Sequence, residues 1–158
     1  MERLKSIPGV GQLAAEVIVA EVGADMSPFP TAGHLVSWAG LCPGHNESAG
    51  KRKSGKTRKG DRWLRTVLNE CALAAIRDRD SRLAARYRRI MRHRGHKKAI
   101  VAVANTILTI SWHLLTSRTT YEELGENYFS QRDRDMRTRN LVHQLERLGH
   151  KVSIEPAA

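Results

Sequence analysis

The basic stretch from residue 46 to residue 65 constrains the fold most, because its central part, residues 51–61, has no apolar side chain to bury in a core. Between Lys51 and Arg65 it holds eight basic residues against one acid, Asp61, and no apolar residue lies between positions 50 and 62. Its three glycines let the backbone come close to a ligand. We therefore predict an exposed, flexible basic loop that binds a polyanion and is presented by the rest of the chain.

The positive charge of the chain is concentrated in its centre. Residues 51–120 hold 19 basic and 4 acidic side chains, a net charge of +15, whereas residues 1–50 carry −3 and residues 121–158 carry −1. A single basic region in a chain of 158 residues indicates one domain with a nucleic-acid-binding surface rather than a uniformly basic protein.

The spacing of apolar residues predicts an all-α fold, a small helical bundle with an appended C-terminal helix. Thr31 and Asp61 are predicted N-caps, and Trp38 is expected to point inward with Leu35 and Val36. No alternating run predicts a sheet. The most apolar segment contains polar residues such as Asn105, which favours a core helix over a membrane span. Helices are predicted at 12–22, 31–39, 61–77, 81–93, 97–117 and 133–148.

The cysteine, acidic and histidine residues do not have the spacing of a disulfide framework or a metal site. Cys42 and Cys71 form no zinc motif, and we expect buried thiols in a reducing compartment. The first residues lack an apolar signal core, so we expect a cytoplasmic, prokaryotic protein. Asp78 and Asp80 flank an arginine, and the seven histidines show no metal-ligand spacing. We therefore expect no metal or other cofactor in this chain.

Residues 4–22 have the pattern of a helix-hairpin-helix. Leu4 and Ile7 precede a turn formed by Gly9, Val10 and Gly11, and small residues then begin a new helix. Backbone N–H groups at the start of that helix can bind a phosphate without reading sequence. Gly9 and Gly11 are thus candidate nucleic-acid contacts, although a plain helix–helix turn would have the same glycines.

Ser48 is the hydroxyl in the basic stretch that has the setting of a nucleophile. It lies in a small-residue turn with Ala49 and Gly50. No acid–base pair is adjacent to activate it, and an ordinary loop serine remains the alternative. Cations could stabilise the charge that develops on a phosphoryl group. The candidate phosphate contacts are Lys51, Arg52, Lys53, Lys56, Arg58, Lys59, Arg62 and Arg65.

Three sequence signatures occur in a fixed order along the chain. They are Ile-Pro-Gly-Val-Gly at 7–11, Leu-Val-Ser-Trp-Ala-Gly-Leu-Cys-Pro at 35–43, and Asn-Glu-Ser-Ala-Gly-Lys-Arg at 46–52 followed by Gly-Asp-Arg-Trp-Leu-Arg at 60–65. Together they resemble the C-terminal Tnp domain of one family of insertion-sequence transposases. That family joins an N-terminal, resolvase-like DEDD nuclease domain to a serine-bearing domain and uses a bridge RNA. The resemblance runs to about residue 121, and more loosely to the end.

The resemblance implies a role for Ser48. The matching serine of the family attacks a DNA phosphodiester and forms a covalent serine–DNA link during strand exchange. The family loop commonly reads Ser-Gly-Gly, where this chain has Ala49 at the middle position. A neighbouring position that is often a second serine is Glu47 here, which leaves Ser48 as the single candidate nucleophile.

The resemblance also implies partners and a domain division. Residues 1–120 would form the Tnp domain, and residues 121–158 a helical extension or tail. DNA, a bridge RNA, a DEDD-domain protein and further copies of the chain would be partners. Mg²⁺ would belong to the N-terminal domain, which has no counterpart here, so we expect a truncated copy, a split half or a fragment. The alternatives are a non-enzymatic helix-hairpin-helix module that binds nucleic acid and a structural protein that binds an acidic partner.

Overall fold

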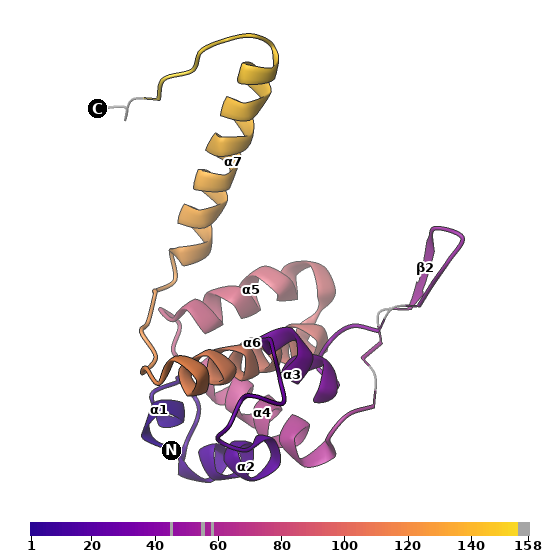
Figure 1. The fold of residues 1–158 in the computed structure, drawn as a ribbon, viewed down its shortest axis with the longest axis vertical. Helices are drawn as coiled ribbons and strands as arrows, with labels where there is room; N and C mark the ends of the chain where they lie inside the picture. The colour runs from indigo at the N-terminus through magenta and orange to yellow at the C-terminus, as the bar shows by residue number, and fades with distance from the viewer. Residues whose placement is uncertain (45, 55, 58, 155–158) are drawn as a thin grey trace.

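The computed structural model describes residues 1–44, 46–54, 56–57 and 59–154, and at 46–48 and 51–54 it describes the backbone. Within these residues the fold is all-α, as predicted, and a two-stranded hairpin is added to seven helices (Figure 1). The elements in chain order are α1 (Glu2–Lys5), α2 (Gln12–Val22), α3 (Ala32–Trp38), β1 (Asn46–Ser48), β2 (Lys51–Ser54), α4 (Arg62–Ala75), α5 (Arg82–Arg94), α6 (His96–Ser117) and α7 (Tyr128–Arg147).

Helix α6 forms the centre of the bundle. It contacts α1, α3, α4 and α5, and apolar side chains along it are buried. By length and composition α6 could cross a membrane, but half of its apolar window is buried inside the protein. This burial confirms the predicted core helix. The buried residues of α6 are Ala99, Ile100, Val103, Ala104, Ile107, Leu108, Ile110, Ser111 and Leu114.

Side-chain caps fix where three of the helices begin. The Thr31 hydroxyl accepts a hydrogen bond from His34 N at 3.4 Å, and an Asp61 carboxylate oxygen accepts one from Leu64 N at 2.6 Å. Both caps were predicted. Ser81 caps α5 in the same way. Each cap satisfies a backbone N–H that has no partner within the helix, which is why these residues set the boundaries.

Two predictions about side chains and helix limits need correction. Trp38 is 46% exposed rather than inward, because Leu35 and Val36 take the core-facing side of the short α3 and leave Trp38 beside Phe29 near the surface. Helix α7 begins at Tyr128, five residues earlier than predicted. It has no buried residue, touches α5 and rises away from the bundle (Figure 1).

The two thiols are free and differ in burial. Cys71 is buried on α4, as predicted, and burial raises the pKa of its thiol to about 11. Cys42, just before the hairpin, is half-buried, so the prediction that both thiols are buried is wrong for Cys42. Cys71 is therefore not an activated nucleophile at neutral pH, since a reactive cysteine needs a lowered pKa.

Candidate nucleic-acid interface

The basic stretch contains a β-hairpin, which the sequence reasoning did not predict. Strand β1 pairs antiparallel with β2, with Ser48 opposite Lys51 and Glu47 opposite Arg52. The connecting residues, Ala49 and Gly50, have φ angles of 50° and 72°. Two successive residues with positive φ form the tight turn whose twist suits a two-residue hairpin. Backbone hydrogen bonds therefore order a segment that has no apolar residue to bury.

This geometry places Ser48 at the end of the hairpin. It is the last paired residue of β1 before the turn. In Figure 1 the hairpin extends away from the helices, with its turn at the outer end. The backbone of the candidate nucleophile thus lies where a long polymer can reach it.

Backbone and side-chain contacts hold the base of the hairpin against the bundle. Pro43 and Thr57 form an isolated antiparallel bridge, and Gly44 N donates to the Lys56 carbonyl oxygen at 3.0 Å. Arg65, on the first turn of α4, places Nη2 3.4 Å from the Thr57 hydroxyl. Gly60 returns to the body of the protein at the end of α3. The loop ends therefore pair with each other, and Gly60 contacts the bundle at Ala39.

The predicted phosphate contacts fall into three groups. The backbone of Lys51, Arg52 and Lys53 forms most of β2. Lys56, Lys59 and Arg62 are exposed between the hairpin and the start of α4, whereas Arg65 is half-buried at the hairpin base. Arg58 lies outside the described residues. Their contact with nucleic acid stays a prediction.

The glycines of residues 4–22 lie far from the hairpin. A Cβ atom at Gly9 would be 2.4 Å from the Cys71 carbonyl oxygen, so this glycine lets the turn approach the C-terminal half of α4. The hairpin leads into the opposite end of α4 at Arg62. Nine residues of helix separate Arg62 from Cys71, or about 14 Å at 1.5 Å per residue. Gly11 begins α2 with no side-chain cap.

Trp63 is a surface feature that the sequence reasoning missed. Its side chain is 74% exposed on the first turn of α4, between Arg62 and the buried Leu64. The helical period would have revealed it, because Leu64 and Leu68 define the buried side of α4 and residue 63 lies about 100° away. An exposed indole beside cations can stack on a nucleotide base.

Acidic and histidine side chains form no metal site within the part of the chain that the structure describes. Among the described residues no three of His, Cys, Asp and Glu come close enough to hold an ion. Asp61, the one acid between Lys51 and Arg65, is engaged as the cap of α4. The arrangement offers a strand end with a hydroxyl residue, with basic residues in the paired strand and near the hairpin base.

The sequence profile described as "Transposase IS116/IS110/IS902 family" matches residues 1–88, more than half of the chain. The matched part contains the hairpin, its base and α4, together with the start of α5.

Several curated proteins are similar over a longer part of the chain. The "Transposase for insertion sequence element IS1111A" of Coxiella burnetii is 35% identical over 124 residues, which are 76% of this chain and 34% of that protein. The "Probable family 20 transposase" of Pseudomonas aeruginosa is 31% identical, over 77% of this chain and 37% of that protein. A "Pilin gene-inverting protein" of Moraxella bovis is 28% identical over 76% of this chain and 38% of that protein. The chain spans about a third of the length of the relatives it matches.

Proposed function

This chain belongs to the IS116/IS110/IS902 transposase family, and from that premise we propose that it is the serine-bearing domain of a DNA transposase. The observation that carries the proposal is the position of Ser48, the last paired residue before the turn of a projecting hairpin. A nucleophile that attacks a polymer must reach its backbone without a clash between the polymer and the protein. A residue beside an outer turn meets that condition.

The proposed reaction is a phosphoryl transfer to serine. The Ser48 Oγ attacks the phosphorus of a DNA phosphodiester and gives up its proton. A bond between Oγ and phosphorus forms as one phosphorus–oxygen bond of the DNA strand breaks, and the freed strand end leaves as a hydroxyl. The covalent link keeps the energy of the broken bond, so a second hydroxyl can later displace the serine and join a new strand.

The cations of the hairpin region would hold the DNA and stabilise the transition state. Lys51, Arg52 and Lys53 lie in the strand opposite β1, and Lys59 and Arg62 are exposed near the base. Positive charge placed where negative charge develops lowers the barrier to phosphoryl transfer. The N-terminus of α2 at Gly11 would supply a more distant phosphate contact.

The partners follow from the family and are proposals for this chain. DNA would be the substrate, and a bridge RNA would select it. A DEDD-domain protein would carry the Mg²⁺ site, for which the described residues offer no ligand cluster. Further copies of the chain would complete the assembly, in the cytoplasm of a prokaryotic cell.

A non-enzymatic helix-hairpin-helix module is the second candidate function. The observation that favours it is the start of α2, where Gly11 is exposed and provides no side-chain cap. Uncapped backbone N–H groups at a helix start attract phosphate regardless of sequence. Such a module would bind nucleic acid through Gly9, Gly11 and the basic residues, and Ser48 would have no chemical role.

A covalent-capture assay separates the two functions. The full chain is incubated with DNA that carries the element ends and target, with bridge RNA and Mg²⁺, and with or without a DEDD-domain protein. The expected result is a denaturant-resistant protein–DNA band that Ser48→Ala abolishes while DNA affinity stays nearly unchanged. Ser54→Ala is the matched control, because Ser54 lies in the same hairpin away from the turn.

Each outcome of the capture assay has a defined meaning. A Ser48-dependent band that needs the added DEDD-domain protein supports a split transposase. A band that persists in Ser48→Ala contradicts the assignment of the nucleophile. Salt-sensitive binding without any band, even with the partner present, contradicts the enzymatic proposal and supports the binding module.

A further inference from the structure

Three arginines come together where the first turns of α7 meet α5, and we refer to Arg82, Arg86 and Arg132 as the arginine cluster. Arg82 places its guanidinium carbon 5.2 Å from the centre of the Tyr128 ring. Arg132, one turn along α7 from Tyr128, and Arg82 both interact with the Tyr128 hydroxyl and lower its pKa. Residues some fifty positions apart in sequence therefore share one small region.

Among the residues that the structure describes, no carboxylate forms an ion pair with any of the three arginines. The Nε atoms of Arg82 and Arg86 are buried and have no hydrogen-bond partner among the described residues. Burial and the neighbouring charges of Arg82, Arg132 and Arg89 lower the pKa of Arg86. A buried cation ordinarily pairs with a carboxylate, because desolvation without a partner is costly.

Three carboxylates near the cluster, those of Glu123, Glu126 and Asp133, are engaged with other groups. Glu123 accepts hydrogen bonds from Arg82 N at 2.8 Å, Gly125 N at 2.9 Å and the Tyr121 hydroxyl at 3.0 Å. Glu126 pairs with Arg88 at 3.2 Å, and Asp133 pairs with Arg89 at 2.9 Å. The arginine cluster is therefore left with a net positive charge that a ligand can neutralise.

We propose that the arginine cluster binds a backbone phosphate of nucleic acid, as an anchor separate from the hairpin. Guanidinium groups match phosphate with paired N–H donors, and Arg suits partly buried ion pairs better than Lys. The proposal rests on the nucleic-acid substrate of the proposed function, and it adds a second site on a different pair of elements.

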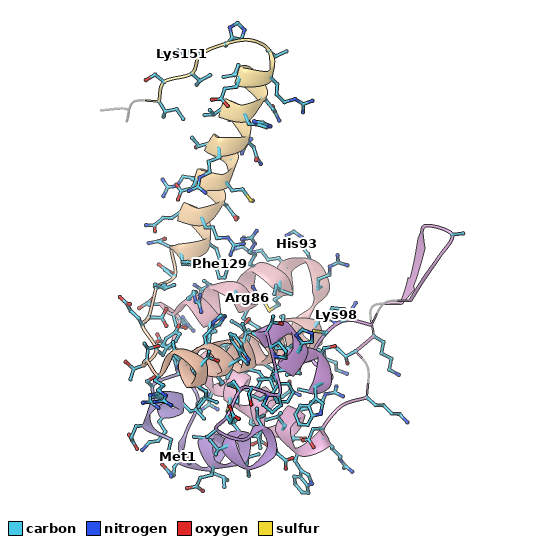
Figure 2. The ribbon with its side chains drawn as sticks, in the orientation of Figure 1. Met1, Arg86, His93, Lys98, Phe129 and Lys151 are labelled. Carbon is cyan, nitrogen blue, oxygen red and sulfur yellow. The ribbon has the colours of Figure 1, made fainter. Side chains whose placement is uncertain are left out.

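The surroundings of the cluster favour a polymer over a small anion. Residues 81–98 contain eight Arg and Lys residues and no acid, so the positive charge continues along α5 into the start of α6. Figure 2 shows Arg86, His93 and Lys98 in succession along these helices, on the side that leads toward the hairpin in this view. A strand bound at the hairpin would meet this row of basic side chains.

The test compares variants that remove one charge each. Arg86→Gln and Arg132→Gln alter the cluster, and Arg147→Gln removes the same charge from the exposed last turn of α7. The probe is a duplex DNA oligonucleotide of arbitrary sequence, bound by the full chain over a series of salt concentrations. We expect each cluster variant to reduce the slope of log Kd against log salt by about 0.9, the value for one lost phosphate contact. Arg147→Gln should keep the wild-type slope.

Failure of this proposal differs from failure of the proposed function. The arginine cluster is not a nucleic-acid anchor if two results coincide. The cluster variants would keep the salt slope of Arg147→Gln, while Lys→Ala variants in the hairpin would weaken DNA binding. The Ser48-dependent band is scored separately, so a missing band with a changed slope overturns the catalytic proposal and leaves this one standing.

Thermal unfolding shows whether the variants are folded and whether the cluster binds inorganic phosphate instead of nucleic acid. Without added anion, Arg86→Gln should unfold at or above the wild-type Tm, because the change removes repulsion from three arginines. If Arg86→Gln proves unstable, the exposed Arg132→Gln carries the test. Inorganic phosphate should raise the Tm of wild type more than that of either cluster variant. Such a phosphate effect with unchanged DNA slopes would mean a site for free phosphate and would overturn the nucleic-acid proposal.

Discussion

Gly60 lies so close to Ala39 that a Cβ atom at residue 60 would be 2.4 Å from the Ala39 carbonyl oxygen. Ala39 is the fully buried C-cap of α3, and Gly60 directly precedes Asp61, the cap of α4. The contact brings together the two points from which the hairpin leaves the bundle and to which it returns. This close backbone approach therefore helps to fix where the hairpin that contains Ser48 joins the bundle.

Gly60→Ala should destabilise the protein and shift the base of the hairpin. The added methyl group meets backbone atoms of Ala39 and Gly40, which cannot rotate away. Overpacking of this kind costs about 1–3 kcal/mol of unfolding free energy. Urea unfolding measures the loss. Gly11→Ala is the control, because nothing lies within 4 Å of a Cβ there and its φ is −85°. Equal stability of the two variants would contradict the contact.

Ala49→Gly should strengthen the hairpin. Ala49 has a φ of 50°, where a residue with a Cβ pays about 1 kcal/mol and glycine does not. Slower amide hydrogen exchange within residues 46–54 would show the gain. Ala49→Val should have the opposite effect, because a β-branched side chain tolerates positive φ least. Faster exchange in Ala49→Gly than in Ala49→Val would rule out this turn.

Trp63→Ala should weaken binding to single-stranded DNA. Stacking of one base on an aromatic ring contributes about 1–3 kcal/mol, which corresponds to a loss of at least about fivefold in affinity. Trp63→Phe should retain part of this contribution. Leu73→Ala is the matched control, since Leu73 is an exposed apolar residue on the same helix, at 43% exposure. Unchanged affinity in Trp63→Ala would exclude a stacking role.

Stability should fall as the pH rises from about 9 to about 11, in part through Cys71. Burial raises the pKa of this thiol to about 11, so the native state keeps a proton that the unfolded state releases near pH 9. The unfolded state then binds fewer protons, and the slope of unfolding free energy against pH is negative. The contribution is fully present below pH 9 and amounts to roughly 2–3 kcal/mol, at 1.36 kcal/mol per pKa unit.

Urea unfolding of wild type and Cys71→Ala across this pH range isolates the thiol from lysine and tyrosine titration. The wild type should lose more stability than the variant between pH 9 and pH 11. Parallel curves would show that Cys71 is not the source.

Helix α7 should support self-association. Leu141, Leu145 and Leu148 follow a spacing of four and three residues and are 53%, 43% and 74% exposed. This spacing places them in one stripe, as in a short coiled coil. Leu145→Ser should shift the full chain toward monomer in sedimentation velocity, whereas the charge change Arg147→Gln should not. A wild type that is monomeric at high concentration would refute the assembly role.

Helix positions were predictable because they depend on neighbours in the sequence. The 3.6-residue spacing of apolar side chains gave α2 its limits, 12–22, and identified α6 as the core helix. Thr31 and Asp61 were recognisable as caps because each bonds a backbone group three residues away. The exposure of Trp38 was not predictable in the same way, because a short helix can turn either side toward the core.

The candidate site was only partly predictable. The basic stretch and Ser48 stand out in the sequence, but the hairpin does not, because backbone pairing and a turn at Ala49 leave no hydrophobic pattern. The arginine cluster is also hidden from a linear reading, since Arg86 and Arg132 come from elements that a whole helix separates.

The sequence by itself determined the helical class, the core helix, the two predicted caps and the place of the positive charge. These properties follow from side-chain chemistry and local spacing, which act over a few residues. Only the tertiary structure decided that Gly60 meets Ala39, that Ser48 pairs with Lys51 beside an outer turn, and that Arg82 and Arg86 have buried Nε atoms without a partner in the part of the chain that the structure describes. Those relationships depend on which distant surfaces come into contact, and contact between distant surfaces is settled by the whole fold.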